Sequence, residues 1–284
     1  MKYVVKTRDN KEYVIEESKI NQFLYNNYIG RILLKIIILP FISKIIGLYQ
    51  DSQISKYSIS NFIKRNNINM EDYQKEDYKT FNEFFTRKIK DNKREINSDN
   101  NTLISPCDAK VLAIKIEENS TFNIKNSTYH INDLTGIDMF NKYQNGYALI
   151  FRLTVEDYHR YSYIDSGYQE ENHKIKGLLH TVRPIAVYNE KVFTRNERNW
   201  TILHTDNFGD VVYIEVGALL VGKIINHNEH NKFTKGEEKG YFKFGASTII
   251  LLVNNIKIDS DILKNSKDNI ETIVKLGEKI GQRL

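Results

Sequence analysis

Short runs of apolar residues, many of them β-branched, follow one another beyond residue 101 and constrain the fold more than any other feature. Each run covers only a few residues and is separated from the next by Gly, Asn and Asp, a pattern typical of β-strands joined by turns. The runs lie at residues 111–114, 147–153, 211–214, 219–225 and 249–253. The sequence therefore predicts a β-rich domain over residues 76–284.

Helical spacing dominates earlier in the chain, between residues 51 and 94, where apolar residues recur on one helix face. Phe81, Phe84 and Phe85 form the most concentrated aromatic group there and are expected to be packing residues. With 284 residues, 40% of them hydrophobic, the chain can bury a sizeable core. We expect an α+β fold, with a helical, membrane-associated N-terminal portion at residues 1–75 followed by the β-rich catalytic domain.

The most apolar stretch, residues 29–49, is interrupted by Arg31, Lys35 and Lys44 and contains Pro40. These interruptions argue against a membrane span, which needs roughly 20 predominantly apolar residues. Cations beside apolar residues instead favour a helix lying at an anionic membrane surface, with Arg31, Lys35 and Lys44 meeting lipid phosphate. The alternative is a helical hairpin packed on the domain core.

Composition argues against several classes of partner and site. The formal net charge is only +5, so no nucleic-acid partner is expected. Cys107 is the only cysteine, which excludes an intramolecular disulfide and argues against a cysteine-based metal site; no metal is expected. Charges replace the apolar run of a secretory signal at the N-terminus. We therefore expect a peripheral protein on the cytoplasmic side of the cell membrane.

Four segments concentrate reactive residues, although each alone is equally typical of a turn or a structural residue. They are SPCD at 105–108, DYHR at 157–160, LHTV at 179–182 and the segment 242–248, which contains Ser247. Walker, Gly-x-Ser-x-Gly, His-Glu-x-x-His and Gly-x-Gly-x-x-Gly motifs are missing. Conventional hydrolase, nucleotide and zinc-protease chemistries therefore lose support.

Taken together, residues 60–284 resemble the phosphatidylserine decarboxylase family, whose members are self-processing, pyruvoyl-dependent proenzymes. The matching segments occur in the order of the family. They are FNEFFTR at 81–87, SPCD at 105–108, DYHR at 157–160, TRNER at 194–198, VGALLVG at 216–222, and GYFKFG at 240–245 followed by Ser247 and Thr248.

The resemblance implies both a cofactor and a reaction. Ser247 would attack the carbonyl of Ala246, cut the chain into 1–246 and 247–284, and become a covalently attached pyruvoyl group. The two fragments would remain partners. The pyruvoyl group would accept the electrons released when phosphatidylserine loses carbon dioxide to give phosphatidylethanolamine. The family uses an Asp and a His for processing, here Asp108 with an imidazole, and His159 is expected to protonate the substrate.

Two positions depart from the family. Ala246 stands where glycine is common, and Ser162 replaces the second histidine of a Tyr-His-Arg-x-His motif that belongs to the processing triad. We expect His180 to supply the missing imidazole, oriented by Asp108, with His159 as the fallback base. In the alternative, His180 packs or binds substrate phosphate.

Two other functions stay open at this point. One is a non-processed relative that binds anionic lipid through residues 29–49 without turning it over. The other is a pyruvoyl decarboxylase acting on a different amino acid. A homodimer is also left open.

Overall fold

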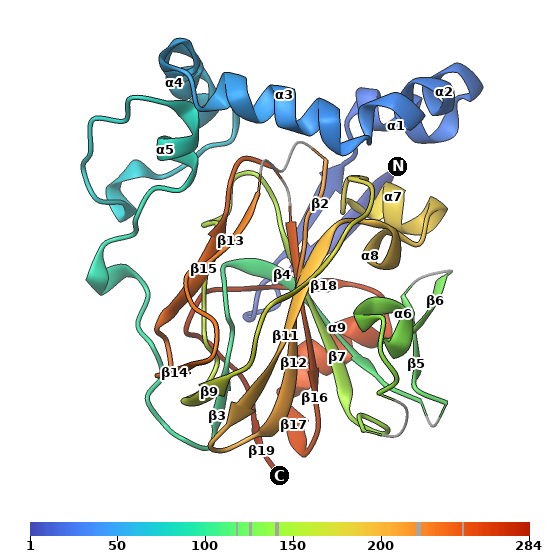
Figure 1. Cartoon of the computed structure of the whole chain (residues 1–284), viewed down its shortest axis with the longest axis vertical. Coiled ribbons are helices and arrows are strands. Elements are labelled where there is room, and N and C mark those ends of the chain that lie inside the picture. Colours follow the sequence, from blue (N-terminus) through green and yellow to red (C-terminus); the bar gives the residue numbers. More distant parts are fainter. Residues whose placement is uncertain (118, 125–126, 140–141, 220–222, 246) are drawn as a thin grey trace.

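A large mixed sheet organises the protein in a computed structural model, which describes the chain apart from residues 118, 125–126, 140–141, 220–222 and 246 (Figure 1). Strand β10 (His173–Ile175) pairs with β11 at one side of this sheet. The other strands run in the order β14 (Asn231–Phe233), β9 (Gly167–Gln169), β11 (Arg198–Thr205), β12 (Gly209–Val216), β16 (Ser247–Val253), β7 (Tyr147–Leu153), β4 (Ala109–Lys115), β18 (Glu271–Val274), β1 (Lys2–Lys6) and β2 (Glu12–Glu16).

Both faces of the central strands are covered, which explains why the strands are almost continuously apolar. In β16, Ile249 and Leu251 point into one buried hydrophobic cluster, whereas Ile250 and Leu252 point into the other. The strands predicted at 111–114, 147–153, 211–214 and 249–253 are confirmed. The strand predicted at 219–225 is wrong in its extent: β13 covers Ile224–Asn226, and residues 220–222 lie outside the described residues.

Smaller sheets and helices cover the large sheet (Figure 1). The small sheets are β13–β15 (Glu238–Phe242)–β8 (Arg160–Ser162), β17 (Ile256–Ile258)–β19 (Lys279–Arg283)–β3 (Thr102–Ile104), and β5 (Thr121–Ile124)–β6 (Ser127–His130). The helices of this part are α6 (Ile131–Thr135), α7 (Pro184–Asn189), α8 (Val192–Arg195) and α9 (Ser260–Lys267).

A layer of helices lies across the top of the sheet in Figure 1. It contains α1 (Lys19–Asn26), α2 (Tyr28–Ile37), α3 (Pro40–Gln50), α4 (Ile59–Arg65) and α5 (Phe81–Phe85), with short 3-10 turns at Gln53–Ser58, Met70–Asp72 and Asp91–Lys93. The sequence sets these boundaries locally. Ser18 accepts a hydrogen bond from the backbone of Asn21, Asn27 ends α1 and caps α2, and Pro40 begins α3.

The prediction of a helical N-terminal portion needs one correction. Residues 2–16 form the β1–β2 hairpin, and β1 joins the large sheet by pairing in parallel with β18. The cause is tertiary: β18 offers an open edge, and alternating side chains suit a half-buried strand. Asn10 adopts the left-handed conformation in the turn, with φ of 68°. The α+β class itself is confirmed.

Candidate active site

Ser247 is the first residue of β16, in the middle of the large sheet. It pairs with Leu153 of β7 and is fully buried. Neither its Oγ nor the Oγ1 of the neighbouring Thr248 has a hydrogen-bond partner among the described residues. Leaving a buried hydroxyl unpaired costs about 1–3 kcal/mol, so such atoms call for a functional explanation. A hydroxyl free to react is what conversion of Ser247 into a cofactor requires.

The backbone just before Ser247 is unusual. Gly245 has φ of 134°, a conformation that L-residues rarely adopt. Ala246, the other half of the predicted cleavage site, lies outside the described residues. Phe244 is anchored by its ring, 5.0 Å from that of Phe81 and 5.2 Å from that of Phe85, and by its amide, which donates to Asn82 Oδ1 at 3.0 Å. The predicted packing role of the α5 aromatics is thus confirmed, and they hold the segment that leads to Ser247.

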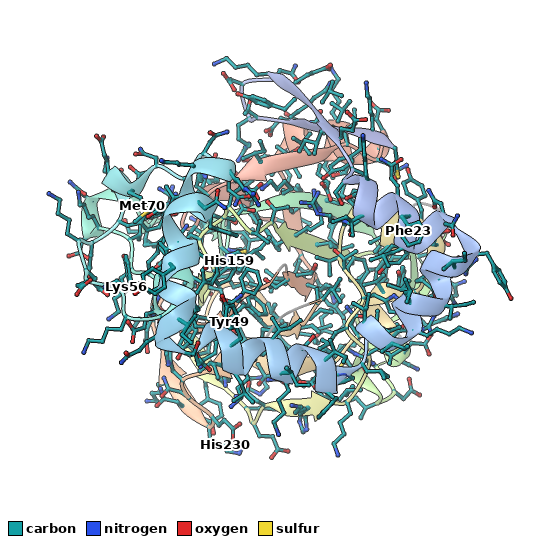
Figure 2. The ribbon with its side chains drawn as sticks, turned by 90° about the horizontal axis from the view of Figure 1, so that it is seen from above. Phe23, Tyr49, Lys56, Met70, His159 and His230 are labelled. Atoms are coloured by element: carbon teal, nitrogen blue, oxygen red, sulfur yellow. The ribbon has the colours of Figure 1, made fainter. Side chains whose placement is uncertain are left out.

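The predicted catalytic residues gather at one end of the sheet. In the sheet register, the start of β16 lies beside the end of β7, and the chain after β7 leads to His159. The start of β16 also lies beside the end of β12, and Leu219 shortly after β12 donates its amide to the His180 carbonyl. Asp108 immediately precedes β4, whose first residues pair near the end of β7. This end faces the helical layer, and in the view from above His159 lies inside the arc of α1 to α4 (Figure 2).

His159 is completely buried and is held from both sides. Its Nδ1 lies 2.9 Å from the carbonyl oxygen of Asp157, and its ring centroid is 4.2 Å from that of Phe85. The Asp157 carboxylate accepts from Lys110 Nζ at 2.6 Å, which fixes the turn. Because a carbonyl can only accept, Nδ1 carries the hydrogen and Nε2 keeps its lone pair. Nε2 has no partner among the described residues.

Burial lowers the pKa of His159 to about 4. The imidazole is therefore neutral near pH 7, with an unpaired basic nitrogen in a closed environment. In that state the unpaired Nε2 can accept a proton.

His180 is buried too, but its hydrogen bonds differ. Its Nδ1 lies 3.2 Å from the hydroxyl of Tyr25, which also accepts from the backbone N–H of Thr181 at 3.3 Å. The Tyr25 hydroxyl can donate to Nδ1 or accept from it, so this contact does not fix which ring nitrogen carries the hydrogen, and Nε2 of His180 has no partner among the described residues. Burial lowers the pKa of His180 to about 4 as well. His159 is therefore the histidine whose contacts fix an unpaired basic nitrogen, whereas those of His180 do not.

Asn196 fixes the His180 backbone. Its side chain accepts from His180 N at 3.0 Å and donates to the carbonyl oxygens of His180 and Gly217, each at 2.8 Å. This side chain joins the LHTV segment to the end of β12.

Asp108 does not orient His180, so this part of the prediction is wrong. Its buried carboxylate accepts from Arg94 Nε at 2.8 Å and Nη2 at 2.5 Å, from Lys275 Nζ at 3.2 Å and from the Leu276 amide at 2.9 Å. The planar guanidinium of Arg94 matches the carboxylate with two parallel bonds. Ser162 and Arg94 line the same cavity of about 240 Å³. Arg94 therefore links Asp108 to the cavity that Ser162 lines, and Ser162 is the residue that replaces the family's second histidine.

A buried ion pair near Ser247 was missed from the sequence. Glu215 of β12 lies opposite Ile249 of β16, and its Oε1 is 2.6 Å from Lys239 Nζ, with both side chains fully buried. Lys239 also donates to Asn226 Oδ1 at 3.0 Å. Glu215 Oε2 has no partner among the described residues. A lone acid inside the apolar strand 211–216 is the signal that could have revealed the pair.

The three cations predicted to meet lipid lie in the helical layer. Arg31 and Lys35 are exposed on α2, and Arg31 Nη2 also lies 3.9 Å from Glu190 Oε1. Lys44 is exposed on α3 and borders a cavity. Among the described residues, no single helix is long and apolar enough to cross a membrane. By length and composition alone, α2 and α3 together pass the test as a pair bent by 67°.

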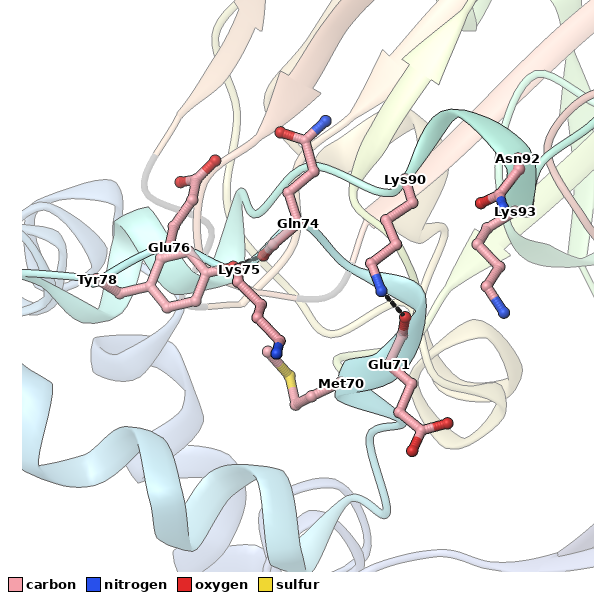
Figure 3. A pocket seen from close by; sticks show the side chains of 9 residues that line it. All are labelled: Met70, Glu71, Gln74, Lys75, Glu76, Tyr78, Lys90, Asn92 and Lys93. Atoms are coloured by element: carbon pink, nitrogen blue, oxygen red, sulfur yellow. Dashed lines mark hydrogen bonds between the residues drawn. The ribbon is translucent and has the colours of Figure 1, made fainter.

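A cavity of about 650 Å³ lies elsewhere (Figure 3). Its lining is mostly charged and polar, and Lys90 Nζ donates to the Glu71 carbonyl at 2.7 Å. None of the predicted site residues lines it.

Comparison with known proteins agrees with the site. The family model for phosphatidylserine decarboxylase matches residues 81–282. Phosphatidylserine decarboxylase proenzyme 2 of Clostridium acetobutylicum is 46% identical, covering 99% of each chain. Phosphatidylserine decarboxylase proenzymes of Clostridium botulinum and Clostridium tetani are 44% and 43% identical, each covering 97% of this chain and 98% and 97% of the relatives. The predicted family and enzyme class are confirmed: this chain belongs to the phosphatidylserine decarboxylase family.

Proposed function

We propose that the chain cuts itself before Ser247, carries a pyruvoyl group at that position, and decarboxylates phosphatidylserine to phosphatidylethanolamine. The buried Ser247 hydroxyl without a partner is the observation that carries this proposal. The pyruvoyl group supplies an electron sink for the loss of carbon dioxide. The residues around it are those that would exclude water and hold protons.

His159 is the base that we propose for processing. Attack of Ser247 Oγ on the carbonyl of residue 246 forms an ester and breaks the peptide bond. The proton leaving Oγ passes to His159 Nε2 and then to the released amine of residue 247. The support is the unpaired, neutral Nε2 of His159. This proposal replaces the expected role of His180, whose Nδ1 faces Tyr25.

The second fragment, residues 247–284, would stay bound after the cut. It provides β16 between β12 and β7, and β18 between β4 and β1. Each of these strands is hydrogen-bonded on both sides to strands of residues 1–246, and this supports continued association of the two fragments.

Membrane association is also proposed, at the cytoplasmic side of the cell membrane. The helices α2 and α3 over the reactive end of the sheet expose many apolar side chains. The exposed set on α2 and α3 comprises Tyr28, Ile29, Ile32, Leu33, Ile36, Phe41, Ile45, Leu48 and Tyr49. Exposed apolar residues beside Arg31 and Lys35 favour contact with an anionic surface.

The test of processing uses intact mass of purified full-length protein. The wild type is expected to yield fragment 247–284, and Ser247→Ala to remain uncut and inactive. An uncut, active Ser247→Ala protein would overturn the proposal.

The two histidines are compared in the same way. His159→Gln is expected to slow self-cleavage by about 10²-fold or more, the usual range for loss of a general base. His180→Gln keeps a side chain that can bond Tyr25 and is expected to cut at nearly the wild-type rate. The reverse result would restore His180 as the base.

A further inference from the structure

A further cavity, of about 210 Å³, lies between α3 and the end of β12. Residues from distant parts of the chain meet there. Those that matter for the argument are Ser43, Lys44, Lys174, Glu197, Gly217 and Lys223.

The cavity carries an excess of positive charge. Lys174 Nζ is 2.9 Å from Glu197 Oε1, so these two charges balance. Lys44 and Lys223 have no ion-pair partner within the described ranges. Two uncompensated lysines at one small cavity favour an anion.

Ser43 provides a second, independent sign of a ligand. Its side chain is only 1% exposed, it lines the cavity, and its Oγ has no hydrogen-bond partner among the described residues. A buried hydroxyl in a cavity that two lysines also line is a suitable donor to a phosphate oxygen. An anion with several acceptor oxygens would satisfy all three groups.

The cavity is next to the reactive end of the sheet. Gly217 directly follows Val216, which pairs with Thr248, so continuing the register brings Gly217 opposite Ser247. A Cβ at Gly217 would lie 3.3 Å from both the Glu197 carbonyl oxygen and Leu179 Cδ2. Glycine therefore keeps this wall open.

Phe41 and Leu48 lie three residues before and four residues after Lys44, so they share its exposed face of α3, whereas Ser43 is buried on the opposite face. Phe41 is 67% and Leu48 66% exposed. A lipid whose chains meet these residues would bring its head group beside Lys44, at the rim of the cavity that Ser43 also lines.

We propose that Ser43, Lys44 and Lys223 bind the phosphodiester of the phospholipid head group, and so place the serine part of the substrate at residue 247. This inference rests on the proposed function and names a subsite for its substrate.

The test measures binding to full-length Ser247→Ala protein, in which turnover cannot occur. Dihexanoyl phosphatidylserine, kept below its micelle concentration, is titrated by calorimetry. Lys44→Met and Lys223→Met keep most of the side-chain length and remove the charge. Each is expected to raise Kd about tenfold, the effect of losing a charged hydrogen bond. The matched control is Lys64→Met on α4, an exposed lysine remote from the cavity lining, expected to change Kd less than about twofold.

Two further titrations identify the source of the anion. Dihexanoylglycerol, which lacks phosphate, should bind weakly and with no difference between variants. Inorganic phosphate should compete only at much higher concentration. Inorganic phosphate that binds more tightly than the lipid would make this a free-phosphate site and overturn the head-group assignment.

The subsite would also be overturned if Lys44→Met and Lys223→Met, each added to Ser247→Ala, left the Kd for dihexanoyl phosphatidylserine unchanged. The proposed function is checked separately, by self-cleavage and carbon dioxide release in protein that retains Ser247. Loss of those activities in the otherwise unchanged chain would reject the function, whatever the binding titrations show.

Discussion

Replacing Lys239 by Met tests how strongly the interior depends on the Glu215–Lys239 pair. Both side chains are 0% exposed, and the pair is joined at 2.6 Å. Burial raises the pKa of Glu215 and lowers that of Lys239, so each group stays charged mainly because it faces the other. Lys239→Met would leave the Glu215 carboxylate buried without its counter-charge.

The expected loss is about 3–5 kcal/mol of unfolding free energy, the usual cost of breaking a buried pair on one side. For a chain of this size the melting temperature should fall by roughly 6–10 °C, at about 2 °C per kcal/mol. The double variant Glu215→Met with Lys239→Met should recover most of the loss, because no uncompensated charge remains.

The assay is thermal and urea denaturation of Ser247→Ala protein, which keeps the molecule a single chain. Lys56→Met is the control. Lys56 and Asp77 pair at 3.1 Å, but their side chains are 50% and 86% exposed, so the change should cost less than about 1 kcal/mol. A loss below about 1 kcal/mol for Lys239→Met, or a double variant no more stable than the single, would refute the reasoning.

Three other outcomes are expected. Because the pKa of His159 is depressed to about 4 in the folded protein, acidification from about pH 6.5 toward 4 protonates the unfolded chain first. Urea titrations should then show stability falling by about 1.4 kcal/mol per pH unit for this group, a slope that His159→Gln removes. Phe41→Asp should reduce sedimentation with anionic vesicles while self-cleavage persists; unchanged sedimentation would place the membrane contact elsewhere. Arg94→Met should cost about 3 kcal/mol in urea titrations by depriving buried Asp108 of two hydrogen bonds; a cost near that of an exposed pair would contradict this.

The sequence predicted the central strands because their apolar residues are set by burial on both faces, which leaves a continuous pattern. The β1–β2 hairpin was not predicted. Its strand character depends on β18, which lies at the opposite end of the chain, and local propensity carries no information about such a partner. The same holds for β13, whose described residues Ile224–Asn226 pair with β15, a partner that the local sequence does not reveal.

The site shows a similar division. The resemblance to the family singled out Ser247, His159 and Asp108 as candidates, and the register brings their segments to one end of the sheet. Their hydrogen-bond partners could not be predicted this way. Arg94 beside Asp108 and Tyr25 beside His180 are contacts between distant segments, so they depend on side-chain directions that only the packed fold defines.

The position of β16 in the middle of the large sheet has a consequence for the order of events in the life of the molecule. The proposed cut before Ser247 would place β16 and β18 on one fragment and the strands that pair with them on the other. The sheet must therefore be complete before the cut, and a mature protein that unfolds must find its other fragment by collision. Recovery from denaturation would then depend on concentration, unlike that of the uncut chain. The durability of the mature enzyme would be set by its unfolding rate rather than by an equilibrium.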